Sequence, residues 1–189
     1  MKRRAFLIAT GSISVSSSPL LMATEADPIE PTLNPHFIQS KQTVELDLTH
    51  QQWETIAAAQ EHLFPAESDS PGASDVNAQD YLYAVLADAN REEADRKLVK
   101  QGAIELDEIS QQQFKKPFTA LNQFDRETSL RAFEQDGGRA WIMTVLGYIF
   151  EALLADPVYG GNPQTIGWQW LQHNPGFPRP QANQRFHQL

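Results

Sequence analysis

The sequence predicts an all-α fold: an irregular helical bundle with long loops and a mostly non-helical C-terminal tail. Apolar residues recur at the 3.6-residue spacing of an amphipathic helix in several segments after residue 48. Alternation of apolar and polar side chains, the pattern of a strand, is confined to the short run 43–48. The composition, with 41% hydrophobic and 21% charged residues, is that of an ordinary globular domain.

The first expected helix follows Thr49. Thr49 and Gln52 have the spacing of a capping box, in which each side chain satisfies a backbone amide of the first turn. Apolar residues then follow at helical spacing as far as Phe64, and Pro65 ends the run. The proline- and glycine-containing stretch 64–73 is expected to be a loop.

Four further helices are expected before the double glycine at 137 and 138. They cover residues 76–90, 92–104, 110–117 and 125–135. The segment 92–104 is rich in charge, which favours a solvated helix with Leu98 and Val99 turned inward. Ser110 and Asp125 are the expected N-caps of the last two.

The most apolar stretch of the chain is the expected helix 139–155. Glu151 is its only charge between Trp141 and Leu154. A helix that is apolar nearly all round must be covered on most sides. It is therefore the central core element or lies partly against a partner subunit, and both can hold. The tail is expected to begin at about residue 156.

The first 26 residues have the form of a twin-arginine export signal. Arg3 and Arg4 are followed by Phe6 and Leu7 and then by an uncharged stretch that is too weakly apolar to span a bilayer. Residues 27–47, with three prolines, are expected to be an extended arm, and residues 48–189 a single helical domain. The expected location is the periplasm.

Charge and cysteine content exclude several functions. The chain has no cysteine, so disulfides, thiolate zinc sites, cysteine-ligated iron–sulfur clusters and covalently attached c-type haem are impossible. The net charge of −9 would deepen to −12 on cleavage after Ala23. So acidic a chain is not expected to bind nucleic acid, and it lacks a basic patch that could bind anionic lipid. Membrane attachment is expected only through partners or an uncleaved signal.

No pattern of catalytic residues stands out. The five histidines lack zinc-binding spacing, and the chain has no G-x-S-x-G, no G-x-G-x-x-G and no C-x-x-C-H motif. Loop 67–75 lacks the ligand pattern of a calcium loop. Tyr159 could act as an acid or base, but a tyrosine in a glycine-rich turn usually has a packing role. We expect no catalytic, cofactor-binding or metal-binding residue in this chain.

The tail carries the most specific sequence. Residues 156–162 (DPVYGGN) leave the apolar helix through a proline and turn at a Gly-Gly-Asn, where positive φ angles cost little. Trp168 and Trp170 follow beside glycines and need a surface to pack on, which is either the bundle or another chain.

These features resemble the gluconate 2-dehydrogenase subunit 3 family. The resemblance rests on DPVYGGN, on Gly167-Trp168, on Gly176-Phe177-Pro178, on the early Phe64-Pro65-Ala66 with Pro71-Gly72-Ala73, and on the twin-arginine start. It runs from about Leu48 to Pro178. It implies a non-catalytic small (gamma) subunit of a membrane-associated periplasmic dehydrogenase that oxidises a sugar, sugar acid or polyol.

The resemblance also implies partners. A large subunit would hold FAD, a multihaem cytochrome c could form a third subunit, and the twin-arginine translocase would export the small and large subunits together. The candidate interface residues are Trp141, Phe150, Asp156, Pro157, Tyr159, Gly160, Gly161, Asn162, Trp168 and Trp170. The alternative is a self-sufficient exported enzyme or small-ligand-binding protein that uses the polar loops around Tyr159.

Overall fold

The computed structural model describes residues 43–182. The predicted export signal 1–26, with Arg3, Arg4, Phe6 and Leu7, lies outside them, as do residues 27–42 of the predicted arm and residues 183–189. Every regular element in the described part of the chain is helical, and this confirms the all-α fold class.

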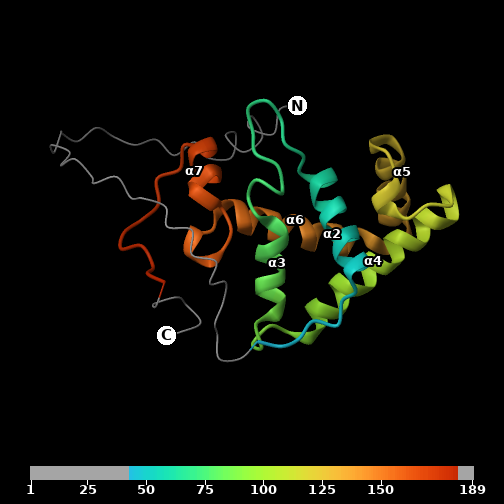
Figure 1. The fold of residues 1–189 in the computed structure, drawn as a ribbon, viewed down its shortest axis with the longest axis horizontal. Helices are drawn as coiled ribbons and strands as arrows, with labels where there is room; N and C mark the ends of the chain where they lie inside the picture. The colour runs from blue at the N-terminus through green and yellow to red at the C-terminus, as the bar shows by residue number, and fades with distance from the viewer. Residues whose placement is uncertain (1–42, 183–189) are drawn as a thin grey trace. The chain divides into compact units, whose positions relative to one another are not determined.

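Six α-helices and four short helical turns make up the described chain (Figure 1). The α-helices are α2 (His50–Leu63), α3 (Ala78–Ala87), α4 (Glu93–Phe114), α5 (Gln123–Phe133), α6 (Arg139–Leu154) and α7 (Ile166–Leu171). The turns are η1 (Phe118–Ala120), the π-helical η2 (Glu134–Gly138), η3 (Pro157–Tyr159) and η4 (Pro163–Thr165).

The start of α2 confirms the predicted capping box. The Gln52 backbone amide donates to Thr49 Oγ1 at 3.3 Å, and the Thr49 amide donates to Gln52 Oε1 at 2.9 Å. Both bonds satisfy amides that a helix N-terminus otherwise leaves without a partner. The sequence pattern therefore located this helix start correctly.

Helix α4 is one long helix, so the predicted break between 92–104 and 110–117 is wrong. Ser110 does not cap a new helix, because it is fully buried within α4 and its hydroxyl donates to the Leu106 carbonyl at 2.8 Å. A serine inside a helix satisfies its hydroxyl in this way without ending the helix. Of the two residues expected to turn inward, Val99 is fully buried and Leu98 is half-buried.

The N-cap of α5 is Asn122, and the prediction of Asp125 was wrong. Asn122 Oδ1 accepts a hydrogen bond from the Asp125 amide at 3.0 Å, and Asn122 Nδ2 donates to the Asp125 carboxylate at 2.8 Å. Asp125 is thus the third residue of the helix, where its negative charge also suits the helix dipole.

Helix α6 is the central element of the core. It packs against α2, α3, α4 and α7, and Figure 1 shows it passing behind α2 and α3. Its Trp141 is 1% exposed, donates from Nε1 to the Val99 carbonyl at 2.9 Å, and lies edge-on to Phe133. Gly102 of α4 makes room for this indole, because a Cβ there would lie 2.1 Å from Trp141 Cδ1. The core interpretation of this helix holds for Trp141.

The run 43–48 forms no strand, and only its first residues lie beside the end of α3. Thr43 makes an isolated antiparallel bridge with Asp88, and the Val44 amide donates to the Ala87 carbonyl at 2.9 Å. The alternating pattern reflects an extended segment that turns Val44, Leu46 and Leu48 partly inward while the residues between them are exposed.

Candidate functional site

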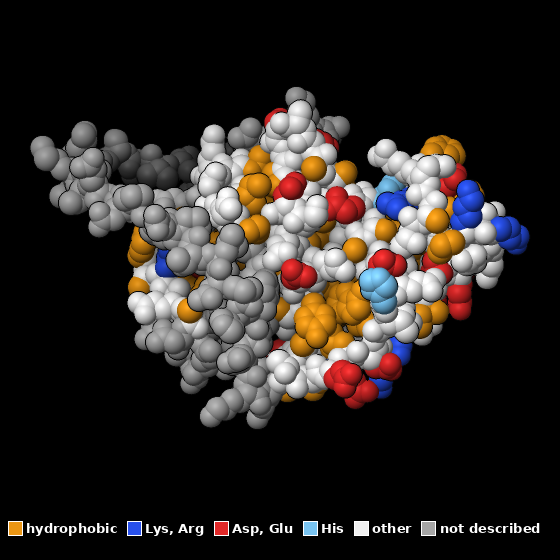
Figure 2. All heavy atoms as spheres, viewed as in Figure 1, with side chains coloured by type: hydrophobic (Ala, Val, Ile, Leu, Met, Phe, Trp, Pro, Cys, Tyr) orange, Lys and Arg blue, Asp and Glu red, His pale blue; other side chains and the backbone are white. Residues whose placement is uncertain are grey.

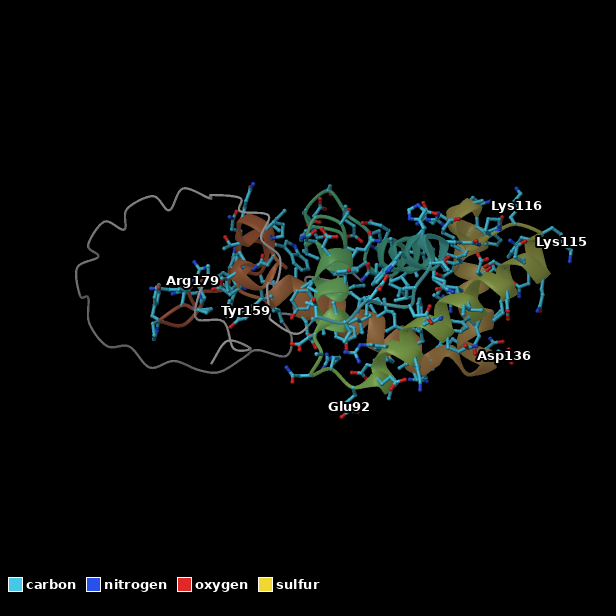
Figure 3. The ribbon with its side chains drawn as sticks, turned by 60° about the horizontal axis from the view of Figure 1, so that its bottom comes forward. Glu92, Lys115, Lys116, Asp136, Tyr159 and Arg179 are labelled. Carbon is cyan, nitrogen blue, oxygen red and sulfur yellow. The ribbon has the colours of Figure 1, made fainter. Side chains whose placement is uncertain are left out.

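The turn that follows α6 is built around Asp156. Its Oδ1 accepts a hydrogen bond from the Val158 amide at 3.1 Å and so caps η3. Its Oδ2 accepts one from Arg179 Nε at 2.8 Å, which ties the end of the described chain back to this turn. Gly160 ends η3 with a φ of 95°, a conformation that glycine adopts easily. Figure 3 shows Tyr159 and Arg179 at the same end of the described part of the chain.

Asn162 holds the next part of the segment together. It is fully buried, and its backbone amide donates to the Val76 carbonyl at 3.0 Å. Its side chain donates to the Ala155 carbonyl at 3.0 Å and accepts from the Gly167 amide at 2.7 Å. Its φ of 51° lies in the left-handed region, which asparagine tolerates better than most residues. The asparagine of DPVYGGN therefore joins α6, the loop before α3 and the start of α7.

Two glycines allow this segment to approach α6 closely. A Cβ on Gly161 would lie 2.6 Å from the Ala152 carbonyl oxygen, and a Cβ on Gly167 would lie 2.2 Å from that of Leu153. Both neighbours are backbone atoms, which cannot rotate away as a flexible side chain could. Gly161, like Asn162, is thus buried inside the chain and serves its internal packing.

Both tail tryptophans pack on the helical bundle. This is one of the two alternatives that the sequence allowed, the other being the surface of another chain. They lie on α7, a short helix that the sequence analysis did not predict within the otherwise irregular tail. Trp168 is 5% exposed, and its Nε1 donates to the Leu154 carbonyl at 2.9 Å. Trp170 is 8% exposed, and its ring stands edge-on to Phe64 at 6.3 Å between centroids.

The outward face of α6 carries a row of large apolar side chains beside the exposed Glu151. Met143, Phe150 and Leu154 are 58%, 40% and 51% exposed. Gly147 lies in the same row, and a Cβ added there would meet nothing within 4 Å. Successive residues of the row are four, three and four positions apart, which is the spacing of one helix face. We call these four residues the α6 stripe. It adjoins the half-buried turn residues Pro157, Val158, Tyr159 and Gly160.

The predicted interface residues therefore separate into two groups. Phe150 lies on the α6 stripe, and Asp156, Pro157, Tyr159 and Gly160 are partly accessible beside it. Trp141, Gly161, Asn162, Trp168 and Trp170 are buried in the chain. For Trp141 the physical reason is its contact with Gly102 in the core, which leaves it no surface to offer a partner. Met143 and Leu154 also face outward but are not among the predicted interface residues, although helical spacing from Phe150 places them on its face.

The ionisable side chains on and next to α6 form hydrogen bonds that link it to its neighbours. Tyr81 Oη donates to Glu151 Oε2 at 3.4 Å, and burial, with the nearby Glu151 carboxylate, raises the pKa of Tyr81 to about 12. Arg91 donates to Tyr148 Oη at 2.7 Å, and burial raises the pKa of Tyr148 as well. Both phenols therefore stay protonated near neutral pH, where they serve as hydrogen-bonding groups rather than as bases.

Within residues 43–182, no group of three or more His, Cys, Asp or Glu side chains is placed to hold a metal ion. In the acidic loop 67–75, Asp75 accepts a hydrogen bond from the Gly72 amide at 2.8 Å, as in an ordinary loop. In the same range, no helix is long and apolar enough to cross a bilayer.

Comparison with known proteins identifies a family. The family model described as gluconate 2-dehydrogenase subunit 3 matches residues 50–176, which is more than half of the 189 residues and includes every helix from α2 to α7. Neither the curated proteins nor the solved structures give a significant match. The chain belongs to the gluconate 2-dehydrogenase subunit 3 family.

Proposed function

We propose that this chain is the non-catalytic small subunit of a membrane-associated periplasmic dehydrogenase that oxidises a sugar, sugar acid or polyol. FAD resides in the large subunit, and a multihaem cytochrome c is a possible third subunit. The small subunit stabilises the large one and carries it through the twin-arginine translocase. Family membership supports the role of a subunit in a dehydrogenase complex, and the α6 stripe supplies a surface for the partner.

The α6 stripe is the single observation on this structure that carries the proposal. Helix α6 is covered by α2, α3, α4 and α7 on its other sides, yet it leaves Met143, Phe150 and Leu154 facing outward in a row. A row of large apolar side chains rimmed by polar residues is typical of a protein–protein contact. The beginning of the tail follows this row in the chain and is held by side-chain hydrogen bonds of Asn162 and Asp156. Stripe and turn together offer the large subunit a fixed surface.

The missing cysteines fit the proposed route of export. Twin-arginine export carries proteins that have already folded, and a chain without disulfides needs no oxidant to fold. The small subunit could therefore fold and bind the large one in the reducing cytoplasm. A single signal would then export both.

Conservative substitution of the two arginines tests this route. The double change Arg3→Lys and Arg4→Lys keeps the positive charge but removes the paired arginines. We expect both the small and the large subunit to remain in the cytoplasm, as measured by fractionation and immunoblotting. A Lys2→Arg change serves as the control and should leave export intact. Export of the flavoprotein by the double variant would contradict the proposal.

A further inference from the structure

A groove on the α3 side of the molecule is separate from the α6 stripe. It has a volume of about 700 Å³ and runs between the extended segment 43–45 and α3. Its lining residues are Thr43, Val44, Glu45, Asp80, Tyr83, Ala84 and Ala87. We call it the α3 groove. Three of its lining residues, Val44, Ala84 and Ala87, are aliphatic, and two, Glu45 and Asp80, carry carboxylates.

An aromatic pair borders this groove. Tyr83 is 51% exposed, and its ring lies 5.6 Å from that of Trp53 on α2 at an interplanar angle of 48°. Figure 2 shows a patch of hydrophobic side chains over α3 and the first turns of α2, with acidic side chains around it. Large aromatic rings that are left accessible beside a groove are typical of recognition sites.

Two carboxylates, Glu45 and Asp80, are among the lining residues of the groove, and none of the seven is Lys or Arg. The nearby cations are engaged elsewhere: Arg91 by Asp95 and Tyr148, and Arg96 by the carbonyl oxygens of Leu86 and Asp88. The nearby Lys100 pairs with Asp47. Within the described part of the chain, by contrast, Glu45 and Asp80 form no ion pair, although both line the groove. Their carboxylates are therefore available to a cation from outside.

We propose that the α3 groove binds a segment of a protein partner that carries lysine or arginine side chains. Such side chains pack their aliphatic stems on an apolar floor and keep their charged ends in water. Val44, Ala84 and Ala87 supply that floor, Glu45 and Asp80 the opposite charges, and the Tyr83 ring a face for a cation. Polyanions such as nucleic acids are repelled by the same charges.

A peptide titration tests the proposal on the full chain. The probe is the peptide GRLRLRG with blocked ends and a neutral dye, and its binding is followed by fluorescence anisotropy. We expect saturable binding that weakens with added salt, because exposed charge pairs are screened. The combined change Glu45→Gln, Asp80→Asn and Tyr83→Ala should weaken binding about tenfold. Circular dichroism verifies that the variant is folded.

A matched variant separates the groove from the general negative charge of the chain. Glu134→Gln and Asp136→Asn remove two carboxylates at the junction of α5 and α6, and Phe124→Ala removes an exposed aromatic ring in the first turn of α5. This control should bind GRLRLRG within twofold of the unchanged protein. Equal weakening by both variants would show non-specific attraction and overturn the proposal. Binding of the uncharged peptide GQLQLQG as tightly as GRLRLRG would also overturn the proposal, because charge would then have no part in recognition. Binding of arginine methyl ester as tightly as GRLRLRG would overturn it too, because the groove would then be a site for a small cation.

Discussion

The helical core and the segment from Asp156 to Leu171 are held together in different ways. In the core, apolar side chains such as Trp141 and Ile149 fill the space between helices, and their spacing along the chain decides which face turns inward. In the segment, side chains bond to backbone groups, as Asn162 and Asp156 do, and glycines allow backbone to meet backbone. The first arrangement tolerates changes that preserve volume, whereas the second depends on individual atoms.

The largest effect is expected in the core. Trp141→Ala should lower the free energy of unfolding by about 3–5 kcal/mol, because it leaves a cavity beside Gly102 and Phe133. Urea denaturation followed by far-ultraviolet circular dichroism measures it. Ala140→Ser, at an exposed position one residue earlier, is the control and should change little. A loss below 1 kcal/mol would mean that α6 is not the centre of the core.

The next effect is expected in the segment. Asn162→Ala removes two side-chain hydrogen bonds and places alanine at a φ of 51°, so it should destabilise the protein by about 3 kcal/mol. Hydrogen exchange should become faster at the Gly167 amide, which loses its acceptor, while the amides of α4 remain protected. The exposed Asn174→Ala is the control. Loss of protection throughout the chain would show that segment and core are one cooperative unit.

A pair of glycine substitutions sharpens the comparison. Gly167→Ala places a methyl group against the Leu153 carbonyl and should destabilise by about 1–3 kcal/mol. Gly147→Ala, on the open face of α6, should instead stabilise by about 0.5–1 kcal/mol, because alanine is the better helix former. Thermal unfolding of both variants measures the difference. Equal effects would contradict the close approach of the two backbones.

The smallest effect concerns a hydrogen bond between His62 of α2 and Glu127 of α5. A hydrogen bond from His62, at 2.8 Å, lowers the pKa of Glu127 below its usual range, and Arg131 adds to this. Because the folded-state pKa is depressed, the stabilisation is present above the unfolded value near 4.5 and is lost as the pH falls through the folded value. The pair is partly exposed, so Glu127→Gln should remove less than about 1 kcal/mol at pH 7. The free energies of unfolding of the unchanged protein and of Glu127→Gln, measured by urea titration, should become equal well below pH 4.

The sequence predicted the helices better than their ends and contacts. Local signals sufficed for the capping box at Thr49 and for the glycine break before α6. They failed at Ser110, because an internal serine and a cap look alike in sequence, and at Asn122, because asparagine and aspartate both cap helices. The start of α3 also lies at Ala78, two residues beyond the predicted Val76.

The candidate site was predicted in part. The sequence singled out DPVYGGN and the two tryptophans as unusual, but it could not show that Asn162 and Trp168 bond to backbone carbonyls of the chain itself. That depends on which distant carbonyl lies within reach, which no local pattern encodes. The helical spacing of the sequence does place the residues of the α6 stripe on one face. It does not show whether that face meets solvent or the core, because this depends on where the neighbouring helices lie.

Affinity capture from the native periplasm tests the role of the α6 stripe most directly. The tagged, unchanged chain should bring down a large subunit with flavin absorbance. The double variant Met143→Asp and Leu154→Lys, which keeps the net charge, should lose it while remaining folded. Phe124→Asp changes an apolar residue on α5 that is even more exposed, at 79%, and should retain the partner. Recovery of the unchanged chain without a flavoprotein, or full capture by the double variant, would contradict the account.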